Sequence, residues 1–148
     1  MERTCVIVKP DAVCRKFSGD IIKRIDSEGL KLLALKMIKP GMRVIEGFYA
    51  VHKDRSFFDQ LVKFMNSAPV IVMAWEGEKA VSKVRAVIGA TNSKEAVPGT
   101  IRNLFGTDNR KNAVHASDSV ENAELEIAYF FKPEEQMSYS YGDWENYK

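Results

Sequence analysis

The chain has 148 residues, of which 45% are hydrophobic and 28% are charged, and 22 Lys and Arg against 20 Asp and Glu leave a net charge of +2. These values are typical of one globular domain and exclude a disordered, collagen-like or low-complexity chain. The longest apolar run, Val70–Trp75, is far shorter than the roughly 20 residues of a membrane span. We therefore expect no membrane association.

The chain starts without the apolar stretch of a signal peptide. Only Cys5 and Cys14 are present, and they form no C-x-x-C pair. A disulfide framework and a zinc site are therefore not expected, and a cytoplasmic location fits this cysteine usage.

Apolar periodicity in the first half of the chain predicts alternating strands and helices. In chain order these are a strand at 4–9 that stops at Pro10, a helix around 21–25, a strand at 30–38 and a short helix at 42–49. The second half continues with two helices on either side of a buried strand, at 57–65, 70–75 and 80–88. A long loop at 89–112, a short strand at 114–116 and a helix from about 120 to 131 follow.

This order predicts an α+β fold, the ferredoxin-like βαββαβ sandwich, with helices packed on a four-stranded antiparallel sheet. No repeat or change in composition divides the chain, so we expect one domain over residues 1–148. Its last part, about 138–148, is a C-terminal tail with four aromatic residues, which we expect to pack on its own or a neighbouring subunit.

The two histidines differ in their neighbours. His52 lies in the charged stretch Val51–Arg55 between predicted helices, and we interpret it as a surface or packed residue and not as a catalyst. His115 lies in Asn112–Ser119, among small residues, hydroxyl groups and a carboxylate, just before a predicted helix. Small neighbours leave room for a ligand, and polar ones can orient an imidazole that is largely neutral at physiological pH and can act as a nucleophile.

Three basic residues indicate what such a nucleophile would attack. Lys9 ends the first predicted strand, Arg85 lies on the helix before the long loop, and Arg102 lies within the loop. Although each alone is commonly a surface charge, together they could form a phosphate cradle. The chain has no G-x-x-x-x-G-K-S/T loop, no G-x-G-x-x-G turn and no protein-kinase motif. It also has no His, Cys or carboxylate cluster with metal-ligand spacing, so we expect no protein-bound metal.

Five segments in register resemble the nucleoside diphosphate kinase family. Asn112–Ser119 reads N-A-V-H-A-S-D-S and is similar to the family's active-site signature N-x-x-H-G-S-D-S. The others are similar to the family's first-strand, helical-hairpin, G-x-T-N and P-G-T-I-R motifs, namely Val8–Asp11, Tyr49 with Lys53–Phe58, Gly89–Asn92 and Pro98–Arg102. The resemblance covers essentially the whole chain.

This resemblance implies transfer of the γ-phosphoryl group of a nucleoside triphosphate, typically ATP, to a nucleoside diphosphate. It implies a ping-pong route through a phosphohistidine and broad base tolerance. His115 would attack through Nδ1, with Ser117 and Glu126 beside or behind its ring and Tyr49 near the transferring phosphate. The implied nucleotide contacts are Lys9, Arg85, Thr91 and Arg102 to phosphate, Lys9 and Asn112 to ribose, and Phe57 with Leu61 to the base.

The resemblance also implies Mg²⁺ carried by the nucleotide phosphates and a homo-oligomer, a tetramer or hexamer built from dimers. Three positions depart from the family pattern. Ala116 replaces a usual Gly and could crowd the site or demand a particular backbone angle, although we expect activity to survive. Ser93 replaces a usual Pro and could loosen its turn, and Asn103–Phe105 replaces G-D-F and puts the loop conformation in question.

Two other interpretations remain open from the sequence alone. RNA-recognition domains share the ferredoxin-like plan, but their aromatic-rich signature is absent and a net charge of +2 is a weak electrostatic footprint. We therefore expect no obligate nucleic-acid partner. A non-catalytic nucleotide-binding protein on the same fold is the second interpretation, and Ala116 is its only local support.

Overall fold

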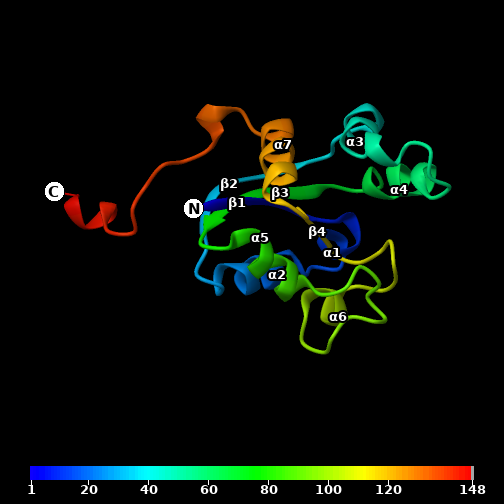
Figure 1. Ribbon diagram of the computed structural model, residues 1–148, viewed down its shortest axis with the longest axis horizontal. Coiled ribbons are helices and arrows are strands. Elements are labelled where there is room, and N and C mark those ends of the chain that lie inside the picture. Colours follow the sequence, from blue (N-terminus) through cyan, green and yellow to red (C-terminus); the bar gives the residue numbers. More distant parts are fainter. Residues whose placement is uncertain (148) are drawn as a thin grey trace.

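The computed structural model describes residues 1–147, and a four-stranded antiparallel sheet in the order β2-β3-β1-β4 forms its centre. The strands are β1 (Glu2–Val8), β2 (Lys31–Ile38), β3 (Val70–Gly77) and β4 (Val114–Ala116). Helices cover the sheet on both sides (Figure 1). The predicted ferredoxin-like sandwich is thereby confirmed; Lys148, the last residue of the predicted tail, lies outside the described residues.

The helices divide between the two faces of the sheet. One face carries α2 (Ser18–Asp26) and α5 (Ala80–Ile88), and the other carries α7 (Val120–Phe130). A second pair, α3 (Met42–Phe48) and α4 (Phe58–Met65), lies at one end of the sheet on the side of α7 (Figure 1). None of the helices within residues 1–147 has the length and apolar character needed to cross a membrane.

Central strand β1 joins two hydrophobic clusters, one on each face of the sheet. Its side chains alternate, so Val6 and Val8 pack with Trp75 beneath α2 and α5, whereas Cys5 and Ile7 pack beneath α7. All four β1 residues are fully buried. Because each buried apolar side chain contributes roughly 1.5–3 kcal/mol, β1 is a rigid base for the residues that follow it.

Two short helices, each of five residues, were not predicted from the sequence. They are α1 (Pro10–Cys14) and α6 (Ile101–Phe105). Pro10 occupies the first turn of α1, where its missing N–H costs no hydrogen bond. The Thr100 side chain caps α6 by accepting a hydrogen bond from Asn103 N. Part of the predicted long loop at 89–112 is therefore helical.

Residues that depart from the family motifs are accommodated locally. Ala116 lies in β4 paired with Val6, and it is not among the residues with positive φ, so this position does not require glycine. Ser93 N donates to Asp108 O at 3.3 Å, a bond that Pro could not make. Asn103 accepts from Gly99 N and donates to Ala96 O, which orders the loop before α6.

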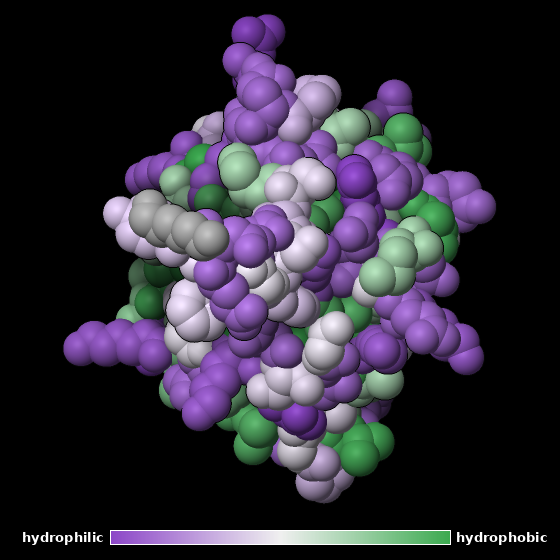
Figure 2. Space-filling model, turned by 90° about the vertical axis from the view of Figure 1, so that its left-hand side faces the viewer, coloured by the Kyte–Doolittle hydropathy of each residue, from purple (hydrophilic) through white to green (hydrophobic). Residues whose placement is uncertain are grey.

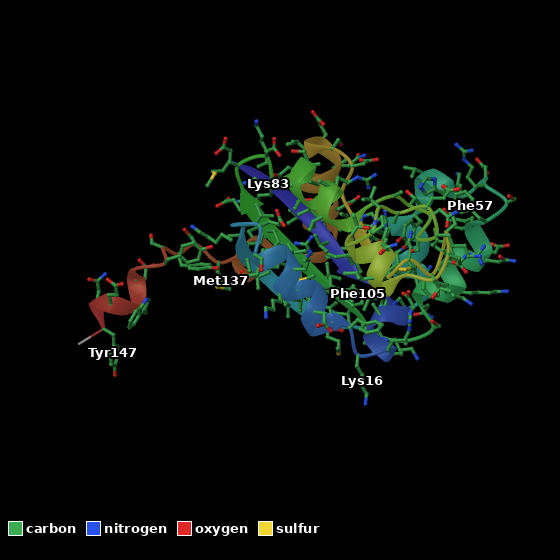
Figure 3. The ribbon with its side chains drawn as sticks, turned by 90° about the horizontal axis from the view of Figure 1, so that it is seen from below. Lys16, Phe57, Lys83, Phe105, Met137 and Tyr147 are labelled. Atoms are coloured by element: carbon green, nitrogen blue, oxygen red, sulfur yellow. The ribbon has the colours of Figure 1, made fainter. Side chains whose placement is uncertain are left out.

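The C-terminal segment first follows β2 and then leaves the body of the protein. Met137 N donates to Leu33 O at 2.8 Å, and the Tyr139 hydroxyl donates to Leu32 O at 2.6 Å. The Tyr141 hydroxyl also donates to Leu30 O at 3.4 Å. Beyond Tyr141 the chain projects outward (Figure 1), and Tyr147 lies far from Phe57 at the opposite end of the molecule (Figure 3). Seen from the side of this projection, the surface is mainly hydrophilic with scattered apolar residues (Figure 2).

Candidate active site

A cavity of about 880 Å³ brings together most of the predicted site residues. Its walls come from the end of β1, the α3–α4 hairpin, α5, the segment after α5, β4 and α7. The predicted residues in the wall are Lys9, Tyr49, Phe57, Leu61, Arg85, Thr91, Arg102, Asn112, His115 and Glu126. Ser117 does not line the cavity and lies fully buried behind Glu126.

His115 is fixed from behind by a carboxylate. The residue lies in β4, paired with Ile7, and its Nε2 is 2.8 Å from Oε1 of Glu126 on α7. An ionised carboxylate only accepts hydrogen bonds, so Nε2 carries the proton. In the neutral ring this arrangement leaves a lone pair on Nδ1, the nitrogen that can act as a nucleophile.

Ser117 fixes the position of that carboxylate. Its hydroxyl donates to Glu126 Oε1 at 2.8 Å and accepts from Cys5 N at 3.1 Å. The backbone of β1 therefore orients Ser117, which orients Glu126, which orients His115. Such a chain of hydrogen bonds holds a side chain in one rotamer and one tautomer.

Two aromatic rings lie beside the imidazole. The ring of Phe48 packs edge to face on His115 with centroids 5.3 Å apart, and Tyr49 lies 6.4 Å away. Burial raises the pKa of Tyr49, with the Glu126 charge adding to the effect. The contact of Phe48 with His115 was not predicted from the sequence. The position of Phe48 next to Tyr49 in a predicted short helix was the one feature that could have indicated it.

Four cationic side chains line the cavity: the three predicted ones, Lys9, Arg85 and Arg102, and Arg110, which was not predicted. Lys9, 6% exposed, ends β1, and Arg102, 4% exposed, donates to Gly89 O at 3.1 Å and to Val114 O at 3.0 Å. Arg85 donates to Ala116 O at 3.4 Å. Within residues 1–147 none of the three pairs with a carboxylate. Because uncompensated buried charge is costly, the buried Lys9 and Arg102 favour an anionic ligand.

Burial and mutual repulsion change the acidity of these cations. The pKa of Lys9 is lowered to about 7, chiefly by burial and then by the charge of Arg102, with Asp11 opposing. The pKa of Arg102 is lowered to about 10 by burial and by Arg85. An arriving polyanion would reverse the repulsive effect, so ligand binding and the protonation of Lys9 are coupled.

Several buried polar atoms at the cavity have no hydrogen-bond partner among residues 1–147. They are the Tyr49 hydroxyl, Arg102 Nε and Asn112 Oδ1. Asn112 is oriented by its amide group, which donates to Thr91 O at 2.9 Å and to Asn109 O at 3.3 Å. Buried polar groups normally have hydrogen-bond partners. These atoms therefore offer one acceptor and two donors to a polar ligand.

The cavity has an apolar wall at the α3–α4 hairpin. Phe57 is 41% exposed, and Leu61 lies one helical turn further along α4. His52, interpreted from the sequence as a surface or packed residue, also lines the cavity, with its ring 5.6 Å from that of Phe57. A planar ring available on one face can stack on an aromatic ligand group.

Comparison with known proteins agrees with this geometry. The family model described as nucleoside diphosphate kinase matches residues 2–136. The chain is 51% identical over 131 residues to a nucleoside diphosphate kinase of Persephonella marina, covering 88% of this chain and 94% of that protein. It is 53% identical over 133 residues to one of Novosphingobium aromaticivorans, covering 90% and 95%.

Solved structures give the same result. The Aquifex aeolicus nucleoside diphosphate kinase superimposes with a TM-score of 0.90 at 47% identity, covering 92% of this chain and 99% of that one. A halophilic nucleoside diphosphate kinase from Halobacterium salinarum in complex with CDP superimposes with a TM-score of 0.92 at 41% identity, covering 99% of both chains.

Proposed function

The chain belongs to the nucleoside diphosphate kinase family, and on this premise we propose that His115 carries the phosphoryl group between two nucleotides. Nδ1 of His115 attacks the γ-phosphorus of a nucleoside triphosphate. The Nδ1–P bond forms as the bond to the bridging oxygen breaks, and the nucleoside diphosphate leaves. A terminal phosphate oxygen of a second nucleoside diphosphate then attacks the same phosphorus, and Nδ1 leaves.

The contact between His115 and Glu126 carries this proposal. As Nδ1 bonds to phosphorus, positive charge develops on the imidazole ring, and the carboxylate 2.8 Å from Nε2 stabilises it. The Nε2 proton stays in place through both half-reactions, so no proton transfer is needed. Ser117 contributes by holding the carboxylate in position.

Positioning and charge neutralisation make up the rest of the chemistry. Phosphoryl transfer spreads negative charge over the oxygens of the transferred group, and fixed cations stabilise that charge. Lys9, Arg85 and Arg102 supply this positive charge. The Tyr49 hydroxyl, which has no partner among residues 1–147, is available as a donor close to the His115 ring. We assign Thr91 to the phosphates as well.

The nucleoside would lie between the cations and the apolar wall. Phe57 would stack on the base with Leu61 beside it, and Asn112 Oδ1 with Lys9 would bind the ribose hydroxyls. Stacking is available to every base. We therefore propose broad base tolerance.

We propose that Mg²⁺ enters as part of the substrate, coordinated by nucleotide phosphate oxygens. The cavity wall presents cations to the phosphates, and no cluster of three His, Cys, Asp or Glu side chains that could hold a metal ion is found among residues 1–147.

We also propose one cytoplasmic domain over 1–148 with a tail from about 138, assembled through dimers into a tetramer or hexamer. Sedimentation of the purified chain tests that assembly.

Initial-rate kinetics test the two-step transfer. Varying ATP at several fixed GDP concentrations should give parallel double-reciprocal lines, because the first product leaves before the second substrate binds. Intersecting lines would indicate direct transfer in a ternary complex and contradict the proposal. The His115→Gln variant, with the same cations and stacking wall, should bind nucleotide but show no transfer.

A further inference from the structure

A strained turn lies immediately before the β4 strand that carries His115. Val114 N donates to Asn112 O at 2.9 Å and closes a three-residue γ-turn, and its central residue, Ala113, has φ +72°. A γ-turn with positive φ at a residue other than glycine is rare and costs energy. The surrounding structure must therefore hold Ala113 in place.

The turn separates two residues of the proposed site. Asn112 precedes it and His115 follows it by two residues. Relaxation of Ala113 to an ordinary backbone angle would rotate the peptides on both sides and change the direction of both side chains. The Asn112 hydrogen bonds and the pairing of His115 with Ile7 both depend on this turn.

One short segment holds both peptide groups of Ala113. Lys9 N donates to Ala113 O at 2.9 Å, and Ala113 N donates to Asp11 Oδ2 at 3.1 Å. The rigid ring of Pro10 lies between these two anchors. The same three residues begin α1 and carry the Lys9 side chain into the cavity.

Asp11 itself has no contact with the reaction. It is not among the residues that line the cavity, and its second carboxylate oxygen, Oδ1, is buried with no hydrogen-bond partner in the described part of the chain. A buried acceptor is kept at some cost in desolvation, which also raises the pKa of Asp11. Its other oxygen, Oδ2, accepts from the amide of the strained residue, 102 positions away in sequence.

We propose that Asp11 is a positioning residue, whose carboxylate holds Ala113 in the γ-turn and thereby aligns Asn112 and His115 with the Lys9 side chain. This rests on the proposed roles of those three residues. The essential feature is an acceptor oxygen at the position of Oδ2; the charge of Asp11 is secondary. Misplacing a nucleophile by about 1 Å can cost roughly 100-fold in rate.

Two substitutions separate geometry from charge. Asp11→Asn keeps an acceptor oxygen in the same place and removes the charge, and Asp11→Glu keeps the charge and moves the oxygens by one methylene. We expect the rate of His115 phosphorylation by ATP, measured in a single turnover, to fall less than about fivefold in D11N and about 10–100-fold in D11E. The reverse order would overturn the proposal and assign Asp11 an electrostatic effect on Lys9.

A second comparison uses the strain itself. Glycine adopts positive φ without cost, so Ala113→Gly should make the turn less dependent on Asp11. We expect Asp11→Ala to slow phosphorylation about 10–100-fold, and the D11A/A113G double variant to recover at least about fivefold of that loss. Equal losses from D11A in both backgrounds would overturn the proposal, as would wild-type rates in D11A.

Controls keep this test separate from the proposed function. Asp20→Ala, which removes an exposed carboxylate from α2, should leave the rate unchanged. If the unaltered chain forms no phosphohistidine, the proposed function fails. If it forms phosphohistidine and the Asp11 variants do so at the same rate, only the inference about Asp11 fails. Thermal unfolding of each variant identifies losses caused by global unfolding.

Discussion

Nε2 of His115 lies 2.8 Å from Oε1 of Glu126. His115 lies on the edge strand β4 and Glu126 on helix α7, the next helix along the chain. Ser117, on the chain between them, bonds the same carboxylate oxygen. The contact fixes the tautomer that leaves Nδ1 unprotonated, which makes Glu126 the residue through which the fold activates its nucleophile.

Glu126→Gln should reduce kcat by about 10–100-fold with little change in the KM of either nucleotide. The amide retains the size of the side chain but loses the charge that stabilises the positive imidazole ring. Steady-state kinetics measure the two constants separately. Glu124→Gln, at an exposed position on the same helix, is the control, and equal effects of the two substitutions would contradict the assignment.

The affinity for ADP should depend on pH through Lys9. Burial and Arg102 lower the pKa of Lys9 to about 7, so in the free enzyme Lys9 is charged below this pH and neutral above it. Phosphate favours the charged form, so binding above pH 7 takes up a proton. We expect the Kd of ADP to rise by up to about tenfold per pH unit between about pH 7.5 and 9.

Titration calorimetry across that range measures both the Kd and the proton uptake. The nucleotide phosphates are already ionised there, and Arg102, with a pKa of about 10, stays charged. Lys9→Gln should bind ADP weakly with no such dependence on pH. A pH-independent Kd in the unaltered chain would show that Lys9 does not bind the phosphates in its charged form.

Phe57→Ala should weaken the binding of all nucleotides alike. Loss of a stacking ring costs roughly 1–3 kcal/mol for any base, so we expect KM for ATP, GTP, CTP and UTP each to rise about 5–150-fold. Phe57→Tyr keeps the ring and should change little. In the unaltered chain, kcat/KM for the four should agree within about tenfold, and a strong preference for one base would contradict the proposed stacking site.

Deletion of residues 138–148 should lower the melting temperature by about 3–10 °C. The tail bonds its own subunit through Tyr139, whose hydroxyl and carbonyl contact Leu32 O and Lys31 Nζ at 2.6 and 2.8 Å. The Tyr141 hydroxyl also donates to Leu30 O at 3.4 Å. Trp144 and Tyr147 are 76% and 90% exposed. Scanning calorimetry and sedimentation measure stability and assembly.

A second variant separates the two parts of the tail. Replacing Trp144 and Tyr147 with Ser leaves the bonds of Tyr139 in place, so a change in assembly without a change in monomer stability would assign the outer part to a neighbouring subunit. If neither the deletion nor this variant alters melting or assembly, the contacts of the tail contribute to neither stability nor assembly.

The long elements of the fold could be predicted because each buries a regular stripe. The continuous apolar run of β3 and the spacing of Val84, Val87 and Ile88 in α5 were sufficient, and Ser119 caps α7 by accepting from Asn122 N. Helices α1 and α6 were missed because five residues span little more than one turn and show no periodicity.

Only part of the site could be predicted from individual residues of the sequence. Local neighbours indicated His115, and its position at a strand end indicated Lys9. The roles given to Glu126 and Phe57 came from the family resemblance, because a helix Glu and an apolar stripe residue look structural in isolation. Contacts made by the fold, such as Asp11 to Ala113 across 102 positions, leave no local pattern in the sequence.

Phosphate trapping tests the central claim most directly. The protein is mixed with Mg²⁺ and ATP labelled in the γ-phosphate, freed of nucleotide, and then given unlabelled GDP. We predict acid-labile, base-stable label on His115 that leaves as GTP, and none on the His115→Gln variant. Folded protein that binds nucleotide yet retains no label, or label that maps to another residue, would contradict the account.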